Sequence, residues 1–278
     1  MIVDAHQHFW DPARGDYGWL KCGSPLARTF GPGDLLPLLA HAGVGGSVLV
    51  QAAPTLAETD WLLDVAERTA TVLGVVGWVD LDDAKVVARL AEWTPRGLVG
   101  IRPMLQDLPD PEWILARSRE DGLRAVAKAG LVLDALVRPV GIDAIVHLAE
   151  RHPDLRIVVD HAGKPPIGDR AAMAAWWHDL ERAAARPNIR CKLSGLLTEA
   201  PPDTPDAAVA ELIGRLVGMW GSERLIWGSD WPVLTLVSDY QRWFDLAWDA
   251  LDGLNEGERQ AVFGGNAIEV YGLYGAEA

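Results

Sequence analysis

Two histidines alternate with a glutamine near the start of the chain, as His6, Gln7 and His8. Successive side chains of an extended strand point to opposite faces, so His6 and His8 face the same way, with Cα atoms about 6.6–6.8 Å apart. Two imidazoles at that separation can converge on one metal ion or one water molecule. The pair is therefore a candidate part of an active site, although an H-x-H pair also arises by chance.

Two further polar residues follow short apolar runs. His161 ends a β-branched run and Asp230 closely follows another. We expect Gly228, two positions before Asp230, to leave room for a ligand beside the carboxylate. The alternative for Asp230 is that it caps the turn that Pro232 begins. Three histidines and one aspartate can bind one divalent metal ion, or they can hold a water molecule with Asp230 as the general base.

The elements that must position these side chains are short apolar runs separated by amphipathic helical patterns. Such alternation predicts parallel strands joined by helical crossovers. The predicted strands are residues 2–6, 47–51, 72–79, 98–102, 131–137, 156–161, 189–193 and 225–227. Helices are predicted at 59–66, 84–93, 142–151, 171–184 and 207–220, with a closing helix at 256–271.

Eight strand–helix units in 278 residues predict a single (β/α)₈ barrel domain over residues 1–278. A doubly wound open sheet is the alternative, but no glycine-rich nucleotide-binding motif follows the first run. Active sites of such barrels lie at the C-terminal ends of the strands. We therefore expect the first, sixth and eighth strands to bring the three histidines and Asp230 to one mouth.

The composition limits the partners. The net charge is −14, from 39 acidic and 25 basic residues, and such a surface repels the phosphates of nucleic acid. No basic run indicates an anionic membrane surface, and no apolar run reaches the roughly 18–20 residues of a membrane span. The start, Met-Ile-Val-Asp-Ala-His, lacks the pattern of a signal peptide, so we expect a cytoplasmic protein with two reduced cysteines.

Several stretches, taken in order, resemble one family. They are "DAHQHFWD", "DYGWL", "VVGWVDL", "GIRPMLQD", "VVDHAGKP", "CKLSGL" and "WGSDWPV", and the resemblance extends to the closing "GGNAIEVYGL". These motifs resemble the sugar-lactonase branch of the amidohydrolase superfamily, which includes L-fuconolactonases and L-rhamnonolactonases. The resemblance implies a (β/α)₈ barrel and a hydrolase that opens the ester ring of a sugar lactone by activated-water attack.

The resemblance also implies roles for individual residues. Asp230, His161 and Arg102 are the expected catalytic residues, and Arg102 is also expected to contact the substrate. Lys164 and Trp231 lie in matching loop motifs and are expected near the substrate. His6 and His8 join His161 and Asp230 as the expected metal ligands.

The expected metal content is at most one divalent ion, with Zn²⁺ the expected ion. Binuclear members of the superfamily use a bridging lysine at the end of the fourth strand and a further barrel histidine. Here Arg102 ends the fourth run, and the seventh run, 189–194, contains no histidine. A metal-independent site is the alternative, because metal-independent lactonases exist in this branch.

Other side chains could serve the site or the core. Trp10 and Trp231 are expected pocket walls, because an aromatic face packs well against the C–H face of a sugar. Gln51 could hydrogen-bond sugar hydroxyls or satisfy buried groups. Lys192 needs a partner if it is buried, and Asp134 or Asp160 could supply one.

Two other functions remain open on the sequence alone. One is a zinc-dependent decarboxylase or an amidase of the same superfamily. The other is a sugar-binding barrel without turnover, which would have no need of a general base.

Overall fold

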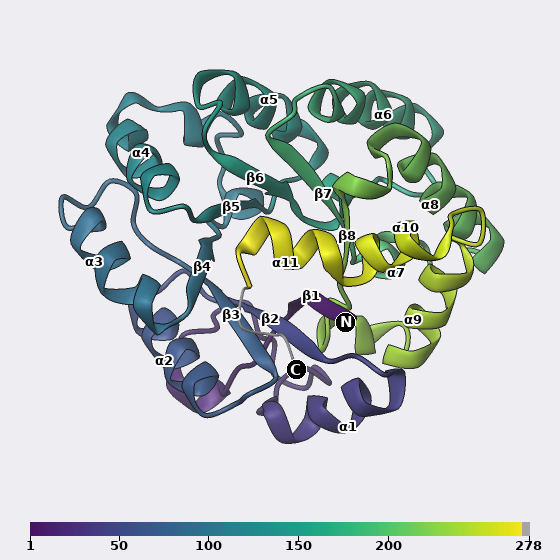
Figure 1. The fold of residues 1–278 in the computed structure, drawn as a ribbon, viewed down its shortest axis with the longest axis horizontal. Helices are drawn as coiled ribbons and strands as arrows, with labels where there is room; N and C mark the ends of the chain where they lie inside the picture. Colours follow the sequence, from purple (N-terminus) through teal and green to yellow (C-terminus); the bar gives the residue numbers. More distant parts are fainter. Residues whose placement is uncertain (274–278) are drawn as a thin grey trace.

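The computed structural model describes residues 1–273, and its eight strands form one parallel sheet in chain order (Figure 1). Each strand overlaps one of the eight predicted runs, so the barrel prediction is confirmed. The strands are β1 (Val3–Gln7), β2 (Gly46–Val50), β3 (Val72–Gly77), β4 (Leu98–Ile101), β5 (Val132–Ala135), β6 (Arg156–Val159), β7 (Ile189–Leu193) and β8 (Leu225–Trp227).

The first and last strands meet at their C-terminal ends, which excludes the open sheet. The backbone N–H of His8 donates to the carbonyl of Trp231 at 2.8 Å, and that of Asp230 donates to the carbonyl of His6 at 2.7 Å. Gln7 and Trp231 form a parallel bridge. This seam joins the segment that carries two of the candidate histidines to the loop that carries the candidate carboxylate.

Helices surround the sheet (Figure 1). The five internal helices predicted from the sequence are present. No helix within residues 1–273 is long and apolar enough to cross a membrane. The helices are α1 (Pro32–Ala42), α2 (Leu56–Glu67), α3 (Val86–Trp93), α4 (Glu120–Lys128), α5 (Ile142–Arg151), α6 (Arg170–Ala184), α7 (Leu196–Glu199), α8 (Asp206–Trp220), α9 (Tyr240–Asp249), α10 (Glu256–Gln260) and α11 (Asn266–Tyr271).

The predicted closing helix is interrupted. A wide π-type turn at Ala261–Gly265 separates α10 from α11. The cause is a close approach to the N-terminal segment, because a Cβ on Gly264 would lie 2.2 Å from the carbonyl oxygen of Met1. The break redirects α11 across the barrel (Figure 1).

The barrel interior is layered. Apolar side chains of the strands, among them Val3, Val132 and Val158, form a buried cluster with Val270 and its neighbours in α11. The helix therefore closes the N-terminal end of the barrel. Alternation along a strand then places the residues two positions after Val132 and Val158 in the next layer, toward the C-terminal mouth. That layer is polar and lies beneath the candidate site.

Candidate active site

Strand β1 delivers His6 and His8 to the mouth on the same side. The two rings lie close together on that side, with their centroids 4.9 Å apart, and the shared side is the one that the alternation predicted. The pairing of β1 with β2 shifts register between Asp4 and Gln7, an irregularity of the kind that re-aims side chains beside active sites. The expectation that Gly228 leaves room for a ligand is wrong. A Cβ there would lie 2.7 Å from the Cβ of His6, so the glycine makes room for the histidine.

His161 and Asp230 lie just beyond the ends of β6 and β8 in left-handed backbone. Their φ angles are 52° and 58°, and Ala162 and Lys164 share the conformation at 50° and 57°. Non-glycine residues adopt it at an energetic cost, and such residues cluster at functional sites. The turns move both side chains out of their strands and aim them across the mouth.

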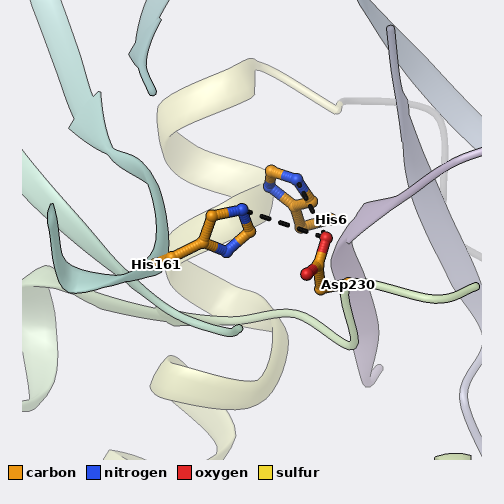
Figure 2. Close-up of side chains that lie close together, drawn as sticks. All are labelled: His6, His161 and Asp230. Atoms are coloured by element: carbon orange, nitrogen blue, oxygen red, sulfur yellow. Dashed lines mark ion pairs between the residues drawn. The ribbon is translucent and has the colours of Figure 1, made fainter. Parts of the chain in front are cut away.

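The three imidazoles converge on one carboxylate oxygen. Nε2 of His8 lies 3.3 Å from Oδ1 of Asp230, and Nε2 of His6 and of His161 lie 3.8 and 3.9 Å from it. Figure 2 shows His6 and His161 reaching the same oxygen from different sides of the barrel. All four side chains are buried.

Each imidazole is held through its other nitrogen. Nδ1 of His8 lies 2.8 Å from the carbonyl oxygen of Val50, which only accepts, so the proton is on Nδ1. Nδ1 of His161 lies 2.9 Å from Oγ of Ser194. Partners of this kind fix the orientation and tautomer of histidines that bind metals or move protons. The ring of His8 is thereby turned so that its Nε2 faces Oδ1 of Asp230.

His6 is held between a carboxylate and a guanidinium. Its Nδ1 lies 3.3 Å from Oδ1 of Asp160, and its Nε2 lies 3.2 Å from Nη1 of Arg102. Burial, and then the charge of Lys192, lower the pKa of His6 well below its usual value, which keeps the ring neutral.

The donor set fits one metal ion. The ligand atoms of His6, His161 and Asp230 all lie within 4.8 Å of one another. Two imidazole nitrogens and one carboxylate oxygen, with oriented rings, are ligands that a catalytic Zn²⁺ accepts. His8, the fourth predicted ligand, is not in this group but contacts the same carboxylate oxygen.

The carboxyl group of Asp230 stays ionised in spite of its burial. Burial acts to raise the pKa of Asp230, but the charge of His161 and the hydrogen bond with His8 outweigh it and hold the pKa well below its usual range. Burial lowers the pKa of His161 to about 4. At neutral pH the site therefore holds an ionised carboxylate beside the neutral imidazoles of His6 and His161.

Arg102 follows β4 and is held from several sides. Its guanidinium donates to the backbone carbonyl of Gln51 and lies 3.5 Å from Oδ2 of Asp160. The amide nitrogen of Gln51 donates in turn to the carbonyl of Arg102 at 2.8 Å. Gln51 is fully buried and does not line the cavity, so its contacts position the arginine.

A cavity of about 240 Å³ opens over this group. Trp10 and Lys164, both predicted, line it, and Nζ of Lys164 lies 2.6 Å from Glu199. Trp231 is not among the residues that line the cavity, because its ring packs edge-on against Phe9 and Phe30. The lining residues are His8, Trp10, Trp19, Ala52, Arg102, Met104, Gln106, Asp107, Leu136, His161, Lys164, Asp230 and Val233.

Part of this wall was not among the residues predicted to line the pocket. Trp19 lies in the loop after β1, where its indole N–H donates to the carbonyl of Ala52 at 2.8 Å. Met104, Gln106 and Asp107 come from the segment after β4. The stretches "DYGWL" and "GIRPMLQD" contain these residues, so the family motifs were the available signal.

Comparisons with known proteins agree with this geometry. Residues 3–273 match the family model described as amidohydrolase. An L-fucono-1,5-lactonase of Burkholderia ambifaria is 47% identical, over 97% of this chain and 94% of the relative. An L-fucono-1,5-lactonase of Burkholderia multivorans is 36% identical, over 98% and 96%. The crystal structure of a B. multivorans amidohydrolase with bound zinc superposes with a TM-score of 0.93 at 34% identity, over 98% and 99%.

Proposed function

Because the chain belongs to the amidohydrolase family, we propose that it is a hydrolase that opens the ester ring of a sugar lactone. The names of its relatives favour L-fucono-1,5-lactone as the substrate, and L-rhamnonolactone remains a second sugar of the same class. The observation that carries the proposal is the convergence of three oriented imidazoles on the buried carboxylate of Asp230, beneath a cavity of about 240 Å³.

In the proposed mechanism Asp230 accepts a proton from a water molecule that the imidazoles of His8 and His161 help to orient. The resulting hydroxide adds to the lactone carbonyl. Arg102 donates to the oxyanion that develops, an interaction that strengthens as charge builds in the transition state. Asp230 then returns its proton to the departing ring oxygen, and an aldonic acid leaves.

His6, His161 and Asp230 would hold at most one divalent ion, and Zn²⁺ is the ion we propose. When bound there, such an ion supplies Lewis-acid polarisation and lowers the pKa of water. The bound zinc of the B. multivorans amidohydrolase supports this assignment. Catalysis without a metal is the alternative.

The cavity suits a small neutral sugar ring. Its volume lies just below the range of typical ligand pockets. Trp10 and Trp19 offer aromatic faces, while Lys164 and Gln106 offer polar groups for hydroxyls. We propose the cytoplasm as the location and no nucleic acid or membrane partner, in keeping with the net charge of −14.

The test is a panel of aldonolactones in both ring sizes, with acid release followed by a pH indicator and spontaneous opening subtracted. We expect turnover of six-carbon lactones, with L-fucono-1,5-lactone among the best substrates. Failure to open any member of the panel would refute the proposal. Release of CO₂ from an aromatic or muconate acid would then indicate the decarboxylase, amide cleavage the amidase, and saturable sugar binding without acid release the non-catalytic barrel.

A further inference from the structure

A buried lysine lies inside the barrel directly beneath the proposed catalytic centre. The side chain of Lys192, from β7, is fully buried. Its Nζ lies 2.5 Å from Oδ2 of Asp134 and 3.1 Å from Oδ1 of Asp160, so both partners considered from the sequence contact it. The same nitrogen lies 3.1 Å from Nδ1 of His6.

The three groups around this ammonium have the arrangement of a metal site. Ligand atoms of His6, Asp134 and Asp160 lie within 4.8 Å of one another and are all buried. Nζ of Lys192 lies within 3.1 Å of one such atom from each of them. The ammonium therefore stands where a cation shared by the three groups would stand.

The two carboxylates that contact Lys192 connect it to the helix that closes the barrel and to the active site. Oδ1 of Asp134 accepts a hydrogen bond of 2.7 Å from the hydroxyl of Tyr271, in the helix α11 that closes the barrel. Asp160, on the other side of Lys192, lies 3.3 Å from His6 through Oδ1. Through Oδ2 it lies 3.5 Å from Arg102.

Electrostatics makes this lysine necessary. Two carboxylates buried in a barrel interior are strongly unfavourable unless a cation or proton compensates them. Arg102 contacts Asp160 but no contact with Asp134 is found among residues 1–273. If Lys192 were neutral, Asp134 would lose its only cationic partner there, and Asp160 would be free to turn away from His6.

We propose that Lys192 is a positioning residue that serves as a built-in cation. It holds Asp160 against His6 and Arg102, and it occupies the place that a second metal ion would otherwise take. The positioning role of Lys192 rests on the function proposed above, because Lys192 acts through residues of that site. The exclusion of a second ion depends only on the buried cluster.

The test is Lys192→Met, which keeps an unbranched side chain and removes the charge. After dialysis against Zn²⁺ or Mn²⁺ and removal of free ion, we expect this variant to retain one more equivalent per chain than the parent. Either ion should also raise its midpoint of thermal unfolding, relative to EDTA, by more than it raises that of the parent. Neither readout requires a working lactonase.

Two control variants separate the cluster from general effects. Lys128→Met removes a charge from an exposed lysine of α4 and should match the parent in metal content and in its response to EDTA. Lys192→Met/Asp134→Asn removes the lysine together with one of the carboxylates, and it should bind no extra ion. Extra metal in this double variant would show that the ion binds elsewhere, and would overturn the proposal.

Measurements of kcat and KM test the positioning role of Lys192. Loss of a residue that orients a ligand typically lowers activity by about 10- to 100-fold. We expect Lys192→Met without added metal to lose that much in kcat with little change in KM, and added Zn²⁺ or Mn²⁺ to restore part of it. Unchanged kcat in a folded variant would refute the positioning role.

The remaining outcomes also decide the matter. A folded Lys192→Met that binds no more metal than the parent would overturn the proposed replacement of a cation. If that variant does not fold, the double variant carries the test, because it no longer contains an unpaired Asp134. We expect it to fold and to show the same loss of kcat, whereas parental kcat would refute the proposal. A parent without lactonase activity would refute the proposed function alone.

Discussion

Replacing Asp230 with asparagine is the sharpest test of the proposed chemistry. Asparagine keeps the size of the side chain but cannot take a proton from water. The backbone at Asp230 has a φ of 58°, a region that aspartate and asparagine tolerate far better than other non-glycine residues. Alanine there would add roughly 1–2 kcal/mol of backbone strain, so the asparagine variant isolates the chemistry.

The expected loss follows from what the carboxylate does in the structure. Oδ1 of Asp230 is the atom on which the three imidazoles converge, so the asparagine variant loses the base that they orient. General acid–base catalysis contributes about 10²- to 10⁴-fold. That range corresponds to about 3–5 kcal/mol of activation free energy, and we expect it to appear in kcat while KM changes much less.

The pH profile of the parent supplies an independent check. Because the pKa of Asp230 is held well below its usual range, activity should persist through the pH at which an ordinary aspartate is protonated. It should fall as the pH drops through about 4, where His161 gains a proton and a positive charge. A fall centred near neutral pH would contradict this assignment.

The assay compares initial rates of lactone opening, metal content and thermal unfolding for Asp230→Asn and the parent. Metal content must be measured beside the rate, because Asp230 is also a proposed ligand. A variant that hydrolyses lactones at the parental rate with unchanged metal content would show that Asp230 is not the base. The mechanism would then be wrong at its centre.

Three further predictions concern Arg102, Trp19 and Glu58, a buried glutamate of α2. Arg102→Met should lower kcat by about 10²- to 10³-fold without unfolding the barrel, as circular dichroism can check, and near-parental turnover would leave Arg102 a structural role. Trp19→Ala should raise KM about two- to tenfold with kcat retained, because it removes one aromatic wall of the cavity, and an unchanged KM would exclude contact with the sugar. Burial raises the pKa of Glu58 from 4.5 to about 7, so the folded state binds its proton more tightly than the unfolded chain does. The free energy of unfolding should therefore fall by about 3 kcal/mol between pH 4.5 and about 7, and urea denaturation should find that Glu58→Gln lacks this loss; equal pH dependence in both proteins would contradict it.

The sequence predicted the barrel well because its strands are buried on both faces. Such strands are continuous apolar runs, and β3, β7 and β8 begin where the runs begin. The closing helix was predicted less well. Its interruption depends on the approach of Gly264 to Met1, a contact between the two ends of the described chain. Periodicity within the segment 256–271 carries no information about that contact.

The sequence identified four residues of the site but not how their side chains are oriented. His6, His8, His161 and Asp230 were found because a residue that ends a barrel strand must lie at the mouth. Their orientation was not predictable, because it depends on partners from other strands such as Ser194 and the carbonyl of Val50. Trp231 was expected in the cavity wall but packs against the loop after β1, whose path only the folded structure reveals.

The strained backbone at the mouth links the fold of the barrel to the proposed chemistry. Among residues 1–273 the non-glycine residues with positive φ are His161, Ala162, Lys164 and Asp230, and all but Ala162 line the cavity. Each such residue costs of order 1–3 kcal/mol, which the surrounding barrel must offset. The seam between β1 and β8 holds the backbone of Asp230, whose N–H donates to the carbonyl of His6. The hydrogen bond that closes the barrel is thus also the one that fixes the proposed base beside its histidine, so changes that loosen the seam should impair catalysis before they unfold the protein.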